Sequence, residues 1–221
     1  MRIDKNRKPC TRELSQLIGI SKMPGSSTKV GKLYHDIPFE DYSVHRKGTA
    51  ERIKMILAAY SVAGKKGLDL GCSVGGISFY LQETGAEMTG IDYDSAVINF
   101  AKAVAVKYKC PVSFICSEIN QQFIDTLKKD SFDFAIWLDN WMWIEKAYGW
   151  NTACLFLGQV SLQIPTLFFS TSQNDGKAKN KIKTAKDVET LLRNNTHYTK
   201  IKNLGAVNDN WHKRSIFICE R

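Results

Sequence analysis

The sequence lacks several features that would assign it to a familiar class. No continuous apolar stretch approaches the roughly 20 residues that a membrane-spanning helix needs, and the charged start has no apolar run behind it. The six cysteines include no C-x-x-C pair, which argues against disulfides and zinc and for buried free thiols. The four histidines show no H-E-x-x-H or similar spacing. We therefore expect no membrane insertion, no metal site and a cytoplasmic location.

An even distribution of charge is also missing. The net charge is +9, but residues 1–35 carry eight Lys/Arg against two acids, and residues 176–221 carry eleven against four. The centre, residues 36–175, has twelve against sixteen. Attraction to a phosphate-bearing partner would therefore come from the two flanks. A pair of solvated lysine-rich surfaces explains the same pattern equally well.

The length of 221 residues and the 43% hydrophobic content suit one well-buried core. We expect a basic N-terminal arm over residues 1–47, which could act as a lid, and one domain over residues 48–221. Within that domain helices alternate with short apolar strands. The expected helices are 49–63, 76–85, 95–109, 120–130, 143–162 and 185–195; the expected strands are 65–71, 87–92, 111–116, 132–138, 165–172, 198–205 and 214–220.

This alternation predicts an α/β fold, Rossmann-like, with a mainly parallel seven-stranded sheet, helices on both faces and an antiparallel last strand. The last two strands are joined by a polar turn, which indicates an antiparallel addition at the edge of the sheet. In the first helix, an apolar stripe is predicted to face the core. Its members are Ala50, Ile53, Ile56, Leu57 and Tyr60.

A glycine-rich turn follows the first strand, with the sequence DLGCSVGG from Asp69 to Gly76. Glycines there let the backbone bend tightly and let a ligand lie against the main chain. The spacing from Gly71 to Gly75 is G-x-x-x-G, so the dinucleotide fingerprint G-x-G-x-x-G fails at its second glycine. This argues against a dehydrogenase.

The segment LDLGCSVGGISFYL resembles motif I of the class I S-adenosylmethionine-dependent methyltransferases, and GIDYD resembles the acidic motif that follows it. The resemblance covers about residues 48–220 by element order. It implies a methyltransferase with S-adenosylmethionine as cofactor. Asp69 would orient the turn or the cofactor's amino group, and the turn backbone would lie against methionine and ribose. The implied turn residues are Asp69, Gly71, Cys72, Ser73 and Gly75.

The same resemblance implies an adenosine-binding set on the next strands. Asp92 would accept hydrogen bonds from the ribose hydroxyls, and Tyr93 would flank the adenine. Glu118 would accept from the adenine amino group beside the Ile119 amide, although the family more often has aspartate there. Leu138 would complete the cofactor pocket.

For Asp92 there is an independent reason: a carboxylate at the carboxyl end of a strand is well placed to accept from a vicinal diol. The alternative is a helix-capping carboxylate, a role that Asp94 fits better.

The stretch LDNWMW follows the fourth strand, where open α/β sheets place reacting ligands. A base is needed only if the acceptor must lose a proton; Asp139 is the first candidate and His45 the second. Asn140 and Trp141 could contact the acceptor, or the tryptophans could be core residues. His45 could instead fix the N-terminal arm.

Acceptor classes can be compared by motif. Many methyltransferases that act on exocyclic base nitrogens resemble one another in an N/D-P-P-Y/F motif after the fourth strand; here the sequence is LDNWMW, which argues against N6-adenine methylation. Ribose 2′-O-methyltransferases resemble one another in a lysine, aspartate, lysine, glutamate set; Asp139 and Glu220 could belong to it, but the fifth strand has no lysine, which argues against this class without excluding it. Lys177 and Lys179 lie in a basic loop after that strand, where lysines suit an anion in general. We expect a small or lipid-linked anionic acceptor, such as a sugar or metabolite. RNA methylation and a non-catalytic cofactor-binding scaffold remain alternatives, and the sequence does not specify an oligomeric state.

Overall fold

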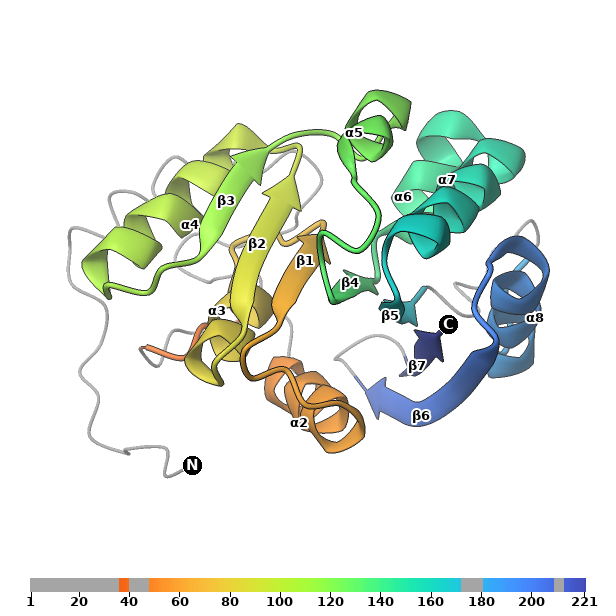
Figure 1. Cartoon of the computed structure of the whole chain (residues 1–221), viewed down its shortest axis with the longest axis horizontal. Coiled ribbons are helices and arrows are strands. Elements are labelled where there is room, and N and C mark those ends of the chain that lie inside the picture. Colours follow the sequence, from red (N-terminus) through yellow and green to blue (C-terminus); the bar gives the residue numbers. More distant parts are fainter. Residues whose placement is uncertain (1–35, 40–47, 172–180, 209–212) are drawn as a thin grey trace.

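The computed structural model describes residues 36–39, 48–171, 181–208 and 213–221. A seven-stranded sheet with the order β3-β2-β1-β4-β5-β7-β6 forms its centre (Figure 1). The five strands β1 to β5 run parallel, and β7 is antiparallel to both of its neighbours. The predicted fold class is confirmed. The strands are β1 Lys66–Leu70, β2 Glu87–Asp92, β3 Ser113–Cys116, β4 Phe134–Leu138, β5 Thr166–Ser170, β6 Lys200–Asn208 and β7 Lys213–Glu220.

Helices cover both faces of the sheet (Figure 1). One core layer contains residues of α2, α3 and α4, and the other contains residues of α5 to α8. Among the described residues, no helix is both long enough and apolar enough to cross a bilayer. The helices are α2 Thr49–Ala59, α3 Gly76–Glu83, α4 Ser95–Lys107, α5 Gln121–Thr126, α6 Trp141–Tyr148, α7 Trp150–Gln163 and α8 Ala185–Asn195.

Strand β4 is apolar at every position because both faces of the sheet are covered there. In β4, Phe134 and Ile136 face the α2–α4 layer, whereas Ala135 and Trp137 face the α5–α8 layer. All four side chains are fully buried. This alternation follows from the two-residue period of a strand and explains why β4 reads as an unbroken apolar run.

Helix α2 differs from its prediction in length and in orientation. It ends at Ala59, because Tyr60 is already extended at φ −152° and ψ 133°. Its buried positions are Thr49, Arg52, Ile53 and Ile56, whereas Ala50 and Leu57 are exposed. The predicted apolar stripe was therefore wrong in part, because the helix turns a threonine and an arginine toward the protein interior.

The single long helix predicted over residues 143–162 is two helices. Gly149 separates α6 from α7 and adopts φ 82° and ψ 163°, a backbone conformation that is essentially restricted to glycine. The apolar periodicity continues through this break, which is why the sequence pattern did not reveal it. The break lets α7 begin a new direction and pack alongside α8.

The end of the sheet also differs from a simple edge hairpin. β7 lies between β5 and β6 and is hydrogen-bonded on both sides, so the outermost strand is β6. Only β7 is reversed, since β6 is antiparallel to β7 and therefore runs in the direction of β1 to β5.

The predicted N-terminal arm lies outside the described residues except for its short piece 36–39. That piece packs on the domain. The Phe39 ring stacks on Tyr108 at 4.6 Å and meets Phe79 edge-on at 5.3 Å. The Tyr80 hydroxyl donates to Asp36 at 3.3 Å, and Ile37 is buried.

Candidate cofactor and acceptor site

The turn after β1 is fixed by hydrogen bonds to the neighbouring strand. The amides of Gly71 and Cys72 both donate to the carbonyl of Ile91 in β2, at 2.8 and 2.9 Å. Gly71, Ser73 and Gly75 all have positive φ, at 80°, 51° and 82°. A serine in this region is uncommon and indicates a backbone that its surroundings impose. The turn is therefore a preformed bend, and Gly75 leads directly into α3.

The space over Gly71 is filled by a residue from the end of β4. A Cβ atom on Gly71 would lie 1.6 Å from Nδ2 of Asn140, which is why only glycine fits. That amide donates to the carbonyl of Leu70 at 3.0 Å. Oδ1 of Asn140 is buried and has no hydrogen-bond partner among the described residues. The site therefore holds a buried acceptor atom beside the glycine turn, where a ligand donor group would satisfy it.

Asp92 ends β2 beside this turn. Its two carboxylate oxygens accept separately, from the amide of Ser73 at 2.9 Å and from the amide of Asp94 at 3.0 Å. Burial raises the pKa of Asp92, and these two backbone hydrogen bonds oppose the shift. A carboxylate offers about four acceptor positions, so Asp92 keeps capacity for a ligand donor. Asp94 caps α4 by accepting from Ala96 at 2.8 Å, so the two carboxylates have separate roles.

Asp69 and Cys72 line the interior side of the turn. The hydroxyl of Ser78 in α3 donates to Asp69 at 2.7 Å and ties the strand to the helix. Burial raises the pKa of Asp69 from its ordinary 3.8 to about 7. Burial also raises the pKa of the Cys72 thiol well above its usual range, so this cysteine is an uncharged packing residue.

The residues predicted to hold adenosine lie at the carboxyl ends of β2 and β3. Tyr93 is 71% exposed and its ring is open to a ligand, whereas Ile119 is buried. Glu118 accepts from Asn120 at 3.4 Å. Its hydrogen bond with the hydroxyl of Tyr148 raises the pKa of that tyrosine to about 12. Tyr148 comes from the end of α6 and joins this rim, although the sequence analysis did not identify it.

Asp139 lies in a buried ionic cluster at the carboxyl ends of the strands. Its carboxylate oxygens form ion pairs with the guanidinium groups of Arg52 in α2 and Arg214 in β7, with nitrogen–oxygen distances of 3.2 Å in both cases. The Ser170 hydroxyl donates a hydrogen bond to the same carboxylate at 2.6 Å. Both carboxylate oxygens are thus engaged, and proton acceptance would require an ion pair to open. This arrangement favours a positioning role for Asp139 over the predicted role of base.

Two further sequence predictions concern residues next to this cluster. Trp141 is fully buried, donates to the carbonyl of Ala153 at 3.3 Å and packs edge-on against Trp150. Its ring fills the core, which favours the alternative that this tryptophan is a core residue over contact with the acceptor. Leu138 is partly buried at the end of β4 and packs against the α2–α4 layer. The predicted residues His45, Lys177 and Lys179 lie outside the described residues.

Arg52 and Arg214 were missed by sequence reasoning. A signal existed for Arg52, since it falls on the buried stripe of α2 at helical spacing with Thr49, Ile53 and Ile56. For Arg214 the alternation of β7 places it on the same side as Ile216 and Ile218. A charged residue on an apolar face is the pattern that would have found both.

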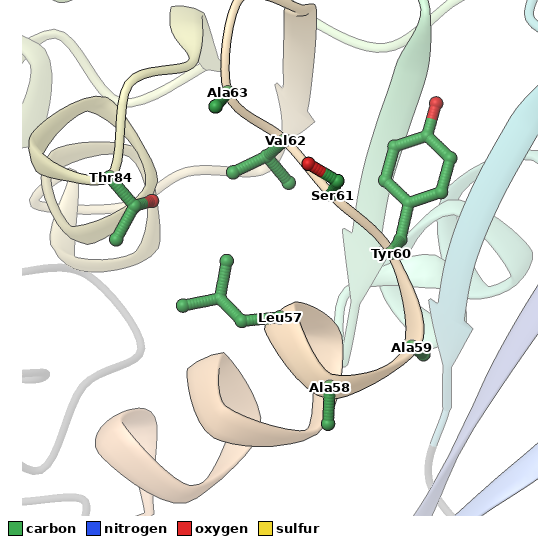
Figure 2. A pocket seen from close by; sticks show the side chains of 8 residues that line it. All are labelled: Leu57, Ala58, Ala59, Tyr60, Ser61, Val62, Ala63 and Thr84. Carbon is green, nitrogen blue, oxygen red and sulfur yellow. The ribbon is translucent and has the colours of Figure 1, made fainter.

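A separate hollow of about 350 Å³ lies at the amino-terminal ends of the strands, on the side of the sheet opposite to the glycine turn along the strand direction (Figure 2). It lies where α2 leads into β1 and where α3 leads into β2. Leu57, Val62 and Thr84 converge on it from different sides. This hollow lies at the amino ends of the strands and is distinct from the glycine turn. Among the described residues, no group of three His, Cys, Asp or Glu side chains is placed to hold a metal ion.

Comparison with known proteins gives a match to a family described as a methyltransferase domain, over residues 61–203, more than half of the chain. Curated relatives include ubiquinone biosynthesis O-methyltransferases of Coxiella burnetii strains. They are 33% identical over 85 residues, which is 38% of this chain and 34% of the relative. The chain thus spans about a third of the length of the curated relatives it matches.

Solved structures share the fold at low sequence identity. The bifunctional kinase-methyltransferase WbdD matches with a TM-score of 0.77 and 18% identity, covering 94% of this chain and 46% of that one. Magnesium protoporphyrin IX methyltransferase from Synechocystis PCC 6803, solved with bound S-adenosylmethionine, matches with a TM-score of 0.61 and 18% identity. That match covers 78% of this chain and 77% of the other.

Proposed function

The chain belongs to the class I S-adenosylmethionine-dependent methyltransferases, and we propose that it transfers a methyl group to a small or lipid-linked acceptor with an anionic group, such as a sugar or metabolite. Its cofactor is S-adenosylmethionine, which supplies an activated methyl group. The observation that carries the proposal is the preformed glycine turn, with the Asp92 carboxylate fixed beside it.

The residues at the turn fit this cofactor chemically. Asp92 keeps acceptor capacity for a ribose diol after binding the amides of Ser73 and Asp94. The buried Oδ1 of Asn140 beside Gly71 suits a cationic amino group, which is a strong donor. Tyr93 offers an exposed ring for stacking on a base, with Glu118 at the neighbouring strand end.

The chain's own task in such a reaction is mainly alignment. The acceptor nucleophile must be held in line with the methyl group at near-attack distance, which lowers the entropic part of the barrier. Parallel strands place their carboxyl ends at one edge, so the turn after β1 and the segment after β4 meet there. We assign Asp139 to positioning this segment. His45 stays a candidate base, and Lys177 and Lys179 stay candidates for the acceptor rim.

The acceptor class rests on two supports. The name of the curated relatives refers to ubiquinone biosynthesis, and the name of one protein with the same fold refers to magnesium protoporphyrin IX. Ubiquinone and magnesium protoporphyrin IX are both small molecules. The chain itself carries an excess of basic residues in both flanks, which would attract an anionic compound. RNA is the competing acceptor. The purified protein should be incubated with labelled cofactor and a cell extract separated into metabolite, lipid, RNA and protein fractions.

We expect label in the metabolite or lipid fraction. Label confined to RNA would replace the proposal with the RNA alternative. Cofactor binding without label in any fraction would favour a scaffold that binds the cofactor without turnover.

The ribose role of Asp92 is tested by Asp92→Ala. Loss of hydrogen bonds to a charged acceptor costs about 1.5–3 kcal/mol each, so we expect affinity for S-adenosylhomocysteine to fall at least about tenfold. Isothermal titration measures this directly. Asp94→Ala is the matched control: it removes the α4 cap but leaves Asp92 in place, so cofactor affinity should change little. Equal losses in both variants would contradict the assignment.

A further inference from the structure

The buried cluster around Asp139 joins three elements at the carboxyl edge of the sheet. Arg52 comes from α2, Asp139 follows β4 and Arg214 opens β7. Their side chains expose only 2%, 3% and 9% of their surface. These ion pairs therefore bring two guanidinium groups to one carboxylate inside the protein.

Burying charged groups costs free energy unless each is paired and hydrogen-bonded. Arg214 is incompletely satisfied: its Nη1 atom pairs with Asp139, whereas its buried Nε has no hydrogen-bond partner among the described residues. A guanidinium presents its donors as a rigid planar fork, which matches the oxygens of a phosphate or carboxylate. The unused Nε–H is a donor of that fork.

The position of the cluster connects it with the reacting edge. Asp139 has a φ of 64°, a conformation that costs a non-glycine residue free energy and is frequent at functional sites. Its amide donates to the carbonyl of Ser170 at 2.9 Å, which holds this conformation. The next residue, Asn140, packs directly on Gly71 of the glycine turn. The arginine-bound carboxylate and the side chain that contacts the turn therefore belong to adjacent residues.

We propose that Arg214, oriented by Asp139 together with Arg52, binds the oxyanion of the methyl acceptor. This inference rests on the proposed function and deepens it, because it moves the anion contact from the lysine-rich loop to a buried arginine. Asp139 acts as the positioning residue that holds the guanidinium fork. The ligand chemistry is a phosphate-type oxyanion, which a soluble metabolite and a lipid-linked compound both offer.

Titration of inorganic phosphate into protein saturated with S-adenosylhomocysteine tests this site. We expect wild-type protein to bind phosphate and Arg214→Gln to bind it at least about tenfold more weakly, the effect of losing a charge-assisted hydrogen bond. Affinity for S-adenosylhomocysteine should be the same in both. The matched control is Arg193→Gln, which removes an exposed arginine paired with Glu189 at 2.9 Å and should leave phosphate binding unchanged.

A second variant distinguishes loss of the binding group from a defect in folding. Arg214→Lys keeps the positive charge next to Asp139 but lacks the fork, so phosphate affinity should fall between those of wild type and Arg214→Gln. Geranyl monophosphate, used in place of inorganic phosphate, separates the sources: tighter binding indicates a lipid-linked acceptor, and equal binding a soluble one. Both results require Arg214.

Two results would overturn the proposal. The first is wild-type protein that binds S-adenosylhomocysteine but no phosphate. The second is phosphate binding that survives Arg214→Gln and is lost when Lys177 and Lys179 are changed to glutamine. Either result leaves the cofactor site intact. Failure to bind S-adenosylhomocysteine at all would instead reject the proposed function.

Discussion

At the scale of single residues, Asp69 combines deep burial with a hydrogen bond from Ser78. Burial raises its pKa from an ordinary 3.8 to about 7. Between these values the folded protein keeps a proton that the unfolded chain has released. The stability that this group contributes is therefore present below about pH 4 and is lost as the pH rises through about 7.

Asp69→Asn should remove this dependence, because an amide does not titrate. We expect the free energy of unfolding of wild type, relative to the variant, to fall by up to about 1.4 kcal/mol per pH unit between pH 4 and 7. Urea unfolding across this range measures it. The exposed Asp125→Asn, which removes only a surface contact with Gln121, serves as the control. A difference that stays constant with pH would contradict the assignment.

Residue roles were only partly predictable from the sequence. The positions of the glycine turn and of Asp92 followed from a strand, a turn and a second strand, since these are local patterns. The surroundings of Asp139 and Trp141 did not, because they depend on partners distant in the chain: Arg214 lies 75 positions beyond Asp139, and Trp150 packs on Trp141 across a helix break. Side-chain type alone does not separate a core tryptophan from one that lines a pocket.

At the scale of elements, the order of strands and helices was predictable because each has its own hydrophobic period. Helix α8 matches its predicted span, and its start is fixed by a capping box between Thr184 and Asp187. The division between α6 and α7 was missed, because one glycine in an apolar helical pattern is compatible with a continuous helix.

This division can be tested at Gly149. A Cβ there meets nothing within 4 Å, so Gly149→Ala isolates the backbone cost. At φ 82° and ψ 163° we expect a loss of about 2 kcal/mol in the free energy of unfolding. Gly64→Ala is the matched comparison, since that site is equally open at φ 73° and should lose about 1 kcal/mol. Chemical denaturation gives both values. No loss at Gly149 would mean that α6 and α7 join differently.

At the scale of the whole molecule, the two edges of the sheet differ in what they offer. The carboxyl edge carries the glycine turn and the Asp139 cluster, and the amino edge carries the hollow near Leu57 and Thr84 (Figure 2). The family's fold predicts the first edge as the binding edge. The sequence did not predict the second, because Leu57 was expected in the core.

Hydrogen–deuterium exchange distinguishes the two edges. Saturation with S-adenosylhomocysteine should slow exchange over residues 69–76 and 92–96, where ligand and backbone meet, since local opening becomes less frequent. Residues 57–63 at the hollow should change little and provide an internal control. The reverse pattern, with protection confined to residues 57–63, would place the ligand at the amino edge.

The insertion of β7 between β5 and β6 has a consequence for biosynthesis. β6 leaves the ribosome before the strand that connects it to the rest of the sheet, since its hydrogen-bonded partner is β7. Without residues 213–220, the strand edges of β5 and β6 that pair with β7 in the folded protein keep their backbone hydrogen-bonding groups unpaired. A released chain that stops before Lys213 should therefore be protease-sensitive and chaperone-binding, whereas the chain that includes residues 213–220 should resist both.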